Sequence, residues 1–154
     1  MDVNYINPFI EASQEVLRQV AGLEARLGKV YIKDSPYKSN SIIVIIGLTG
    51  KIRGQVLFTM STQAAKNVAS SMMGGMPLAE MDEISKSAIS ELTNMIMGNT
   101  ATIFYNRGIN VEITPPSFLM GDNMRISSNK MKTICVPLKL KNDDLLELDI
   151  SLEG

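Results

Sequence analysis

The sequence predicts an α+β fold, in which three helices pack against a mainly antiparallel β-sheet. Helical periodicity is confined to three segments, and the other apolar runs are short, rich in β-branched residues and separated by turn residues. Helices and strands come in blocks and do not alternate as βα units, which favours antiparallel pairing. The chain of 154 residues is 45% hydrophobic and 20% charged, so it is large and apolar enough to form one domain over residues 1–154.

The first helix is expected over residues 7–21. Asn7 is a good N-cap, and Pro8 suits the first helical position because the N–H that proline lacks has no partner there. Apolar residues then recur with a helical period until Gly22, which suits a helix end.

Strands follow this helix, and the most apolar of them covers residues 41–48. Its sequence, SIIVIIGL, has no polar face, so we expect it to be covered on both sides, by helices or by a partner subunit. Thr49-Gly50 is expected to be a tight turn into the alternating residues 51–60, which complete a hairpin. A shorter strand is expected over residues 29–33.

Two further helices separate this hairpin from the C-terminal strands. Ser61-Thr62 offers a cap for the first of them, which is expected to end at Gly74-Gly75. Asp82 caps the second, a long helix over residues 82–107. Pro137 favours an edge or bulge position for its strand. The C-terminal strands are expected over residues 109–114, 117–120, 124–127, 130–140 and 145–152.

The long helix has two opposite faces of different composition. At about 100° per residue, a core stripe forms from Ile89, Leu92, Ile96, Thr100 and Ile103. The opposite face carries Ser87, Glu91, Asn94, Gly98 and Ala101. It sets a carboxylate and a carboxamide one turn apart among small residues, where an ordinary exposed face carries long solvated side chains. We expect this face to be accessible and to contact another molecule. Met95, which lies beside Asn94, is expected to contact the same molecule. The alternative is an ordinary solvated face without function.

Composition excludes several classes of function. The chain has no histidine, which rules out Ser-His and Cys-His catalysis and His-ligated metals. Cys135, the only cysteine, lies in an apolar strand segment and is interpreted as a buried structural thiol. A net charge of -1 without a basic run disfavours nucleic-acid binding, and no apolar run reaches the roughly 18 residues of a membrane span. Because the N-terminus also lacks signal-peptide features, we expect a cytoplasmic protein, without a metal site of its own.

Glu91 and Asn94 can perform limited but definite chemistry. A carboxylate accepts hydrogen bonds from a partner's lysine or arginine, and a neutral amide donates and accepts at once, so it can hold a water in a fixed orientation. Glu11 and Gln14 repeat this arrangement on the first helix, among other polar residues that indicate an ordinary surface. Whether they form a second site stays open.

The motif Ser87-x3-Glu91-x2-Asn94, followed by Pro115-Pro116, resembles the signature of the CheC/CheX/FliY family of bacterial chemotaxis phosphatases. The segments VIIGLTGKIRGQVLFTMS, SMMGGM and VEITPP are similar, in the same order, to those of its CheX branch. The spacing leaves open which of the two prolines is the equivalent one. The presence of a single Glu-x-x-Asn motif favours a one-site pattern.

This resemblance implies a phosphatase that dephosphorylates a CheY-like receiver domain. It implies that Glu91 pairs with the receiver's active-site lysine, and that Asn94 orients a water for in-line attack on the aspartyl phosphate. Ser87, Gly98 and Ala101 then give clearance for the docking receiver. The resemblance further implies a homodimer that has no cofactor of its own, because the receiver holds the Mg²⁺. A non-catalytic receiver-binding module, such as a flagellar-switch component, is the alternative.

Overall fold

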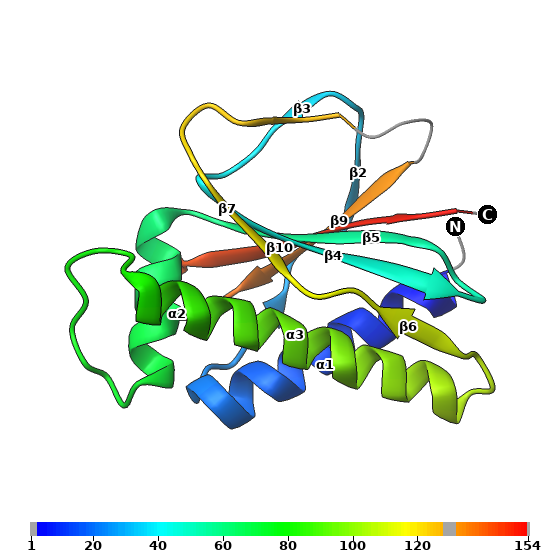
Figure 1. Cartoon of the computed structure of the whole chain (residues 1–154), viewed down its shortest axis with the longest axis horizontal. Coiled ribbons are helices and arrows are strands. Elements are labelled where there is room, and N and C mark those ends of the chain that lie inside the picture. The colour runs from blue at the N-terminus through cyan, green and yellow to red at the C-terminus, as the bar shows by residue number, and fades with distance from the viewer. Residues whose placement is uncertain (1–2, 128–131, 154) are drawn as a thin grey trace.

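The computed structural model describes residues 3–127 and 132–153. Three helices, α1 (Val3–Ala21), α2 (Thr62–Met72) and α3 (Glu83–Asn106), lie together below the main sheet in Figure 1. All strand pairs in the described residues are antiparallel. The α+β class with three helices, one of them long, is therefore confirmed.

The main sheet has eight strands, and a separate pair lies on the side away from the helices (Figure 1). The strands are β1 (Arg26–Leu27), β2 (Tyr31–Lys33), β3 (Tyr37–Lys38), β4 (Ile42–Gly50), β5 (Gly54–Met60), β6 (Val111–Ile113), β7 (Ser117–Met120), β8 (Arg125–Ile126), β9 (Thr133–Lys139) and β10 (Leu145–Leu152), with a short 3-10 helix at Lys141–Asp143. The main order is β1-β9-β10-β5-β4-β6, while β2 also pairs with β9 and β7 with β4. Strands β3 and β8 form the separate pair.

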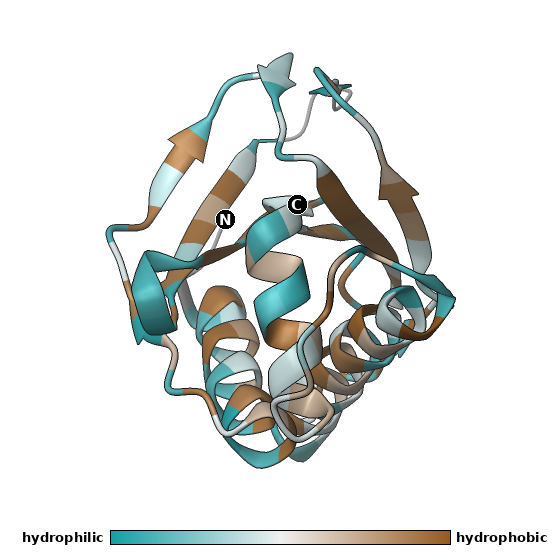
Figure 2. Ribbon diagram, turned by 90° about the vertical axis from the view of Figure 1, so that its left-hand side faces the viewer, coloured by the Kyte–Doolittle hydropathy of each residue, from teal (hydrophilic) through white to brown (hydrophobic). Residues whose placement is uncertain are grey.

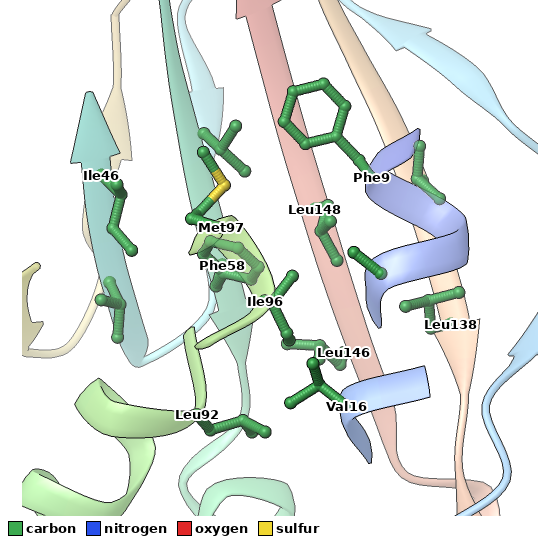
Figure 3. Packing of buried hydrophobic residues seen from close by; sticks show 14 of the residues in the cluster. Phe9, Val16, Ile46, Phe58, Leu92, Ile96, Met97, Leu138, Leu146 and Leu148 are labelled. Atoms are coloured by element: carbon green, nitrogen blue, oxygen red, sulfur yellow. The ribbon is translucent and has the colours of Figure 1, made fainter. Parts of the chain in front are cut away.

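The hydrophobic core lies between the helices and the sheet. In Figure 2 the helices carry alternating bands of hydrophobic and hydrophilic residues, as amphipathic helices do. Figure 3 shows side chains of both layers meeting: Phe58 and Leu148 from the sheet face Ile96 and Val16 from the helices. This packing fixes the orientation of α3, since one side of it must stay against the sheet.

Helix α1 begins earlier than the capping pattern at Asn7-Pro8 predicts, so Asn7 is not its cap. The additional turn is stabilised by tertiary packing that the local sequence does not reveal. The rings of Tyr5 and Phe9 meet the ring of Phe104 edge-on, with centroids 6.3 and 5.7 Å away. The end of the helix is as predicted, because Gly22 adopts a φ of +63° there.

Strand β4 is the run that was expected to be covered on both faces. Ile46 belongs to the core between the sheet and the helices, and Ile43 on the opposite face is also fully buried. The chain itself covers Ile43, so no partner subunit is needed there. The turn expected at Thr49-Gly50 is wrong, because pairing of Gly50 with Val111 extends the strand through it.

Pro137 was predicted at an edge or a bulge, and the edge alternative is wrong. Strand β9 pairs with β10 on one side and with β1 and β2 on the other. Pro137 faces the break between β1 and β2, where its carbonyl accepts a 2.8 Å hydrogen bond from the Gly28 N–H. A gap in the neighbouring strand thus accommodates the missing donor. None of the helices in the described residues combines the length and hydropathy needed to cross a bilayer.

Candidate functional site

Helix α3 is anchored at its N-terminus by the cap that the sequence predicts. One Asp82 carboxylate oxygen accepts hydrogen bonds from the N–H of Ser85 at 2.8 Å and from its hydroxyl at 2.6 Å. These bonds lower the pKa of Asp82 below its ordinary value. The helix continues without a proline to Asn106, so side chains along it keep regular helical spacing.

The core face of α3 is close to the prediction. Ile89, Leu92 and Ile96 are fully buried, and only the last turn differs. Ile103 is half-buried, while Phe104 next to it is fully buried beneath the rings of α1. The aromatic contact with α1 therefore replaces Ile103 at the end of the stripe.

The opposite face is accessible, as expected. Ser87 and Glu91 are exposed, and Asn94 is half-buried. Within the described residues, the side chains of Glu91 and Asn94 have no hydrogen-bond partner. Both are therefore free to bind groups from outside the chain.

These side chains open into a cleft of about 530 Å³ between the N-terminal half of α3 and the segment that enters β7. Its lining residues are Glu83, Lys86, Ser87, Ser90, Glu91, Asn94, Pro116 and Phe118. Of the two prolines that the sequence left open, Pro116 lines the cleft. The sites predicted from the sequence at Ser87, Glu91 and Asn94 are thus brought together in one place.

Three predicted contact residues lie outside this cleft. Met95 and Ala101 are half-buried and pack partly against the core. Gly98 lies farther along the same face as Asn94, and a Cβ added to it meets no atom within 4 Å. These residues can contribute to a docking surface, but not to the cleft.

The structure adds residues that the sequence interpretation missed. Ser90 and Lys86 lie one and two helical turns before Asn94, so their spacing was visible in the sequence. The Lys86 ammonium is 3.5 Å from the Glu83 carboxylate. Phe118 comes from β7, and only the tertiary fold brings it to the cleft.

The similar pair on α1 is engaged within the chain. The Gln14 amide donates a 3.1 Å hydrogen bond to the carbonyl of Ala25. The Glu11 carboxylate is 3.9 Å from the Arg107 guanidinium. This pair therefore differs from Glu91 and Asn94, whose side chains make no such contacts with the residues that the structure describes.

A second polar cluster lies on the other face of the sheet. Ligand atoms of Cys135, Glu147 and Asp149 are within 4.8 Å of one another, which is a spacing that suits a metal. The Lys33 ammonium, however, is 3.2 Å from each carboxylate and supplies the positive charge. It also lies 4.7 Å from the centre of the Tyr37 ring. The cluster is therefore an internal ion network.

Burial determines the protonation of this network. Desolvation raises the pKa of the Cys135 thiol to about 12, so it is not a nucleophile and fits the structural role that we predicted. Desolvation also raises the pKa of Asp149, against the opposing effect of Lys33. Burial alone lowers the pKa of Lys33, but the charges of Asp149 and Glu147 outweigh it and raise this pKa.

The cleft on α3 offers two carboxylates, an ammonium, an amide and two hydroxyls. Ser87 and Ser90 have no histidine to activate them, because the chain contains none. The arrangement instead suits two tasks: Glu91 can hold a cationic group, and Asn94 can orient a water.

Comparisons with known proteins identify the family of this chain. The family model described as chemotaxis phosphatase CheX matches residues 42–139. The protein named CheY-P phosphatase CheX from Thermotoga maritima is 33% identical over 154 residues, which cover all of this chain and 99% of that protein.

Two solved structures are similar over nearly the whole chain. The chemotaxis protein CheX of Desulfovibrio desulfuricans is 29% identical with a TM-score of 0.87, covering 97% of this chain and 99% of that one. The CheX–CheY–BeF3–Mg²⁺ complex of Borrelia burgdorferi contains a chain that is 29% identical with a TM-score of 0.84, covering 97% and 98%. The family match and the full-length similarity to the Thermotoga protein lead to one conclusion: this chain belongs to the CheX family of chemotaxis phosphatases.

Proposed function

We propose that this chain hydrolyses the aspartyl phosphate of a CheY-like receiver domain, with Asn94 positioning the water and Glu91 holding the receiver. The observation that carries the proposal is the cleft itself. Glu91 and Asn94 both line it, and neither side chain is satisfied by another described residue. The names of the Thermotoga and Borrelia relatives, a CheY-P phosphatase and a complex with CheY, support the choice of substrate.

Glu91 serves as the anchor. It is exposed at the mouth of the cleft, where its carboxylate can accept a charge-assisted hydrogen bond from a receiver lysine. An exposed ion pair contributes only about 0–1 kcal/mol, so Glu91 chiefly sets the orientation of the partner.

Asn94 acts on the water. Its carbonyl oxygen accepts one hydrogen bond from the water, and its NH₂ group donates to a phosphoryl oxygen. The water oxygen then forms a bond to phosphorus while the bond between phosphorus and the receiver's aspartate breaks. The products are inorganic phosphate, which takes up the water's proton, and a free aspartate carboxylate. Because Asn94 is half-buried in the wall of the cleft, its amide is held with limited freedom.

This mechanism needs no strong base and no metal of this chain. An aspartyl phosphate is a labile acyl phosphate, so the position of the water is the main requirement. The Mg²⁺ is assigned to the receiver; in the Borrelia complex, CheY is accompanied by Mg²⁺ and by beryllofluoride, a chemical mimic of a phosphoryl group. The lack of histidine in this chain is therefore compatible with catalysis.

We also propose that the chain forms a homodimer through its sheet. Strands β1 and β2 lie at one edge, and the large apolar residues of this edge segment are exposed. These residues are Leu27, Val30, Tyr31 and Ile32. An apolar edge strand is a template for pairing with another chain.

Phosphate release from a phosphorylated CheY receiver tests the proposal. Asn94→Ala is expected to lower kcat by at least about 100-fold while the receiver still binds, because a positioning group is lost. Glu91→Ala is expected to raise KM by no more than about fivefold, because an exposed ion pair to the receiver is lost. Gln14→Ala is the matched control, since it removes an amide that is already bonded to Ala25, and it is expected to leave the rate unchanged.

Two outcomes contradict the mechanism. An Asn94→Ala variant that works at the wild-type rate excludes Asn94 from the reaction. Binding of the receiver without faster phosphate loss in the wild-type chain instead supports a non-catalytic receiver-binding module.

A further inference from the structure

Two large apolar side chains on α3 are turned toward solvent. Ile84 is 68% exposed and Tyr105 is 69% exposed, near opposite ends of the helix. At about 100° per residue, both lie within about 40° of the direction in which Glu91 points. They therefore belong to the same face as the proposed site, not to the core face.

Single exposed apolar residues are common on protein surfaces, so exposure alone carries no conclusion. The position of these two is more informative. At about 1.5 Å per residue, Ile84 lies about 15 Å before Asn94, and Tyr105 lies about 16.5 Å after it. A standard protein interface buries about 800 Å² per partner, and a flat disc of that area has a radius of about 16 Å. A receiver centred on Asn94 therefore just reaches both side chains.

We propose that the receiver footprint extends along α3 from Ile84 to Tyr105, and that these two side chains are the apolar contacts that set its affinity. This inference rests on the proposed function, because it takes Asn94 as the centre of the footprint. The occupant is one receiver domain, whose docking surface must present apolar side chains on both sides of its phosphorylated aspartate.

The chemistry of the face supports apolar anchors at its ends. Six of the eight residues that line the cleft around Asn94 are polar or charged, and the exposed ion pair of Glu91 contributes little affinity. Interfaces obtain most of their affinity from a few well-buried side chains, among which tyrosine is enriched. Phe118 in the cleft already packs partly against the core, so it has less surface left to bury. Ile84 and Tyr105 have most of their side-chain surface still exposed and available for burial.

Equilibrium binding to a CheY receiver loaded with beryllofluoride and Mg²⁺ tests the footprint, using a receiver that the wild-type chain dephosphorylates. Ile84→Ser and Tyr105→Ser are each expected to raise Kd by about tenfold, while kcat at saturating receiver stays unchanged. Tyr105→Phe keeps the ring and is expected to retain wild-type binding. Leu119→Ser is the matched control, because Leu119 is 42% exposed and follows Phe118 on β7, so its side chain points to the opposite face of the strand from the cleft.

The outcomes separate this inference from the proposed function. A wild-type chain that does not accelerate phosphate loss contradicts the proposed function itself. If the wild-type chain is active but either serine variant binds with wild-type Kd, the footprint is wrong while the function stands. A tenfold loss in Leu119→Ser also overturns the footprint, because the effect is then not specific to α3. Every replaced side chain is exposed, so all variants are expected to unfold at the same midpoint as the wild-type chain. Thermal unfolding of each variant checks this.

Discussion

Gly98 allows stability and activity to be separated at one position. Glycine in a helix interior is less favourable than alanine by about 0.5–1 kcal/mol. Apart from its chain neighbours and the adjacent helix backbone, a Cβ added at Gly98 meets no described atom within 4 Å, so no clash opposes the gain. Gly98→Ala is therefore expected to stabilise the fold by about 0.5–1 kcal/mol, which corresponds to about 1–4 °C in Tm for a chain of this size.

The effect on activity depends on side-chain size. Gly98 lies one turn after Asn94, about 6 Å along the axis of α3 and on the same face. Gly98→Gln keeps good helix propensity but fills the space that we assign to the receiver. Forcing extra atoms into a packed contact costs about 1–3 kcal/mol, so kcat/KM is expected to fall roughly 5- to 150-fold.

Thermal unfolding and phosphate release on the same samples provide the assay. The expected pattern is a raised Tm for both variants, with a large loss of kcat/KM only for Gly98→Gln. A Gly98→Gln variant with wild-type kcat/KM refutes the assignment of this space to the receiver. A lowered Tm for Gly98→Ala refutes the premise that the fold leaves the position open.

Two further predictions concern the ion network on the face of the sheet away from the helices. Lys33→Met leaves the fully buried Asp149 carboxylate without its cation, so the free energy of unfolding at pH 7 is expected to fall by about 3–5 kcal/mol. Because burial raises the pKa of Asp149, its carboxylate takes up a proton at a higher pH in the folded variant than in the unfolded chain. Denaturant titrations are therefore expected to show that the decrease in the free energy of unfolding becomes smaller as pH falls from 7 toward 4. A decrease that does not depend on pH contradicts this role. Cys135 is fully buried with a raised pKa, so a thiol reagent at pH 8 is expected to modify it only at the rate of unfolding, and rapid labelling of the folded protein excludes the structural role.

Most elements could be predicted because their signals are local. The Asp82 cap, the helical period and the proline-free length were sufficient to identify α3, and its observed bounds differ little from the expected ones. Strands β7 and β10 have the predicted bounds. The start of α1 was missed because it depends on rings of α1 packing against Phe104, about a hundred residues later. Residues 130 and 131 of the predicted strand before Leu140 lie outside the described residues.

Some residues of the candidate site could likewise be predicted from the sequence, and others could not. Glu91 and Asn94 were visible because helical spacing alone puts them on one face, and Ser87 follows by the same rule. Phe118 was not visible, because its place opposite α3 depends on the pairing of β7 with β4. Met95 was expected to touch a partner, and the structure leaves it beside the cleft and half-buried, since its long side chain lies partly against the core.

Because α3 is uninterrupted, the site tolerates substitutions differently from insertions and deletions. Glu91 and Asn94 share one rigid helix, so the spacing between the group that holds the partner and the group that acts on it is encoded in residue count. Insertion of one residue between them turns one against the other by about 100° and shifts it by about 1.5 Å. Substitutions along the outer face can therefore retune partner choice gradually, whereas a single-codon insertion or deletion between the two abolishes their joint action at once.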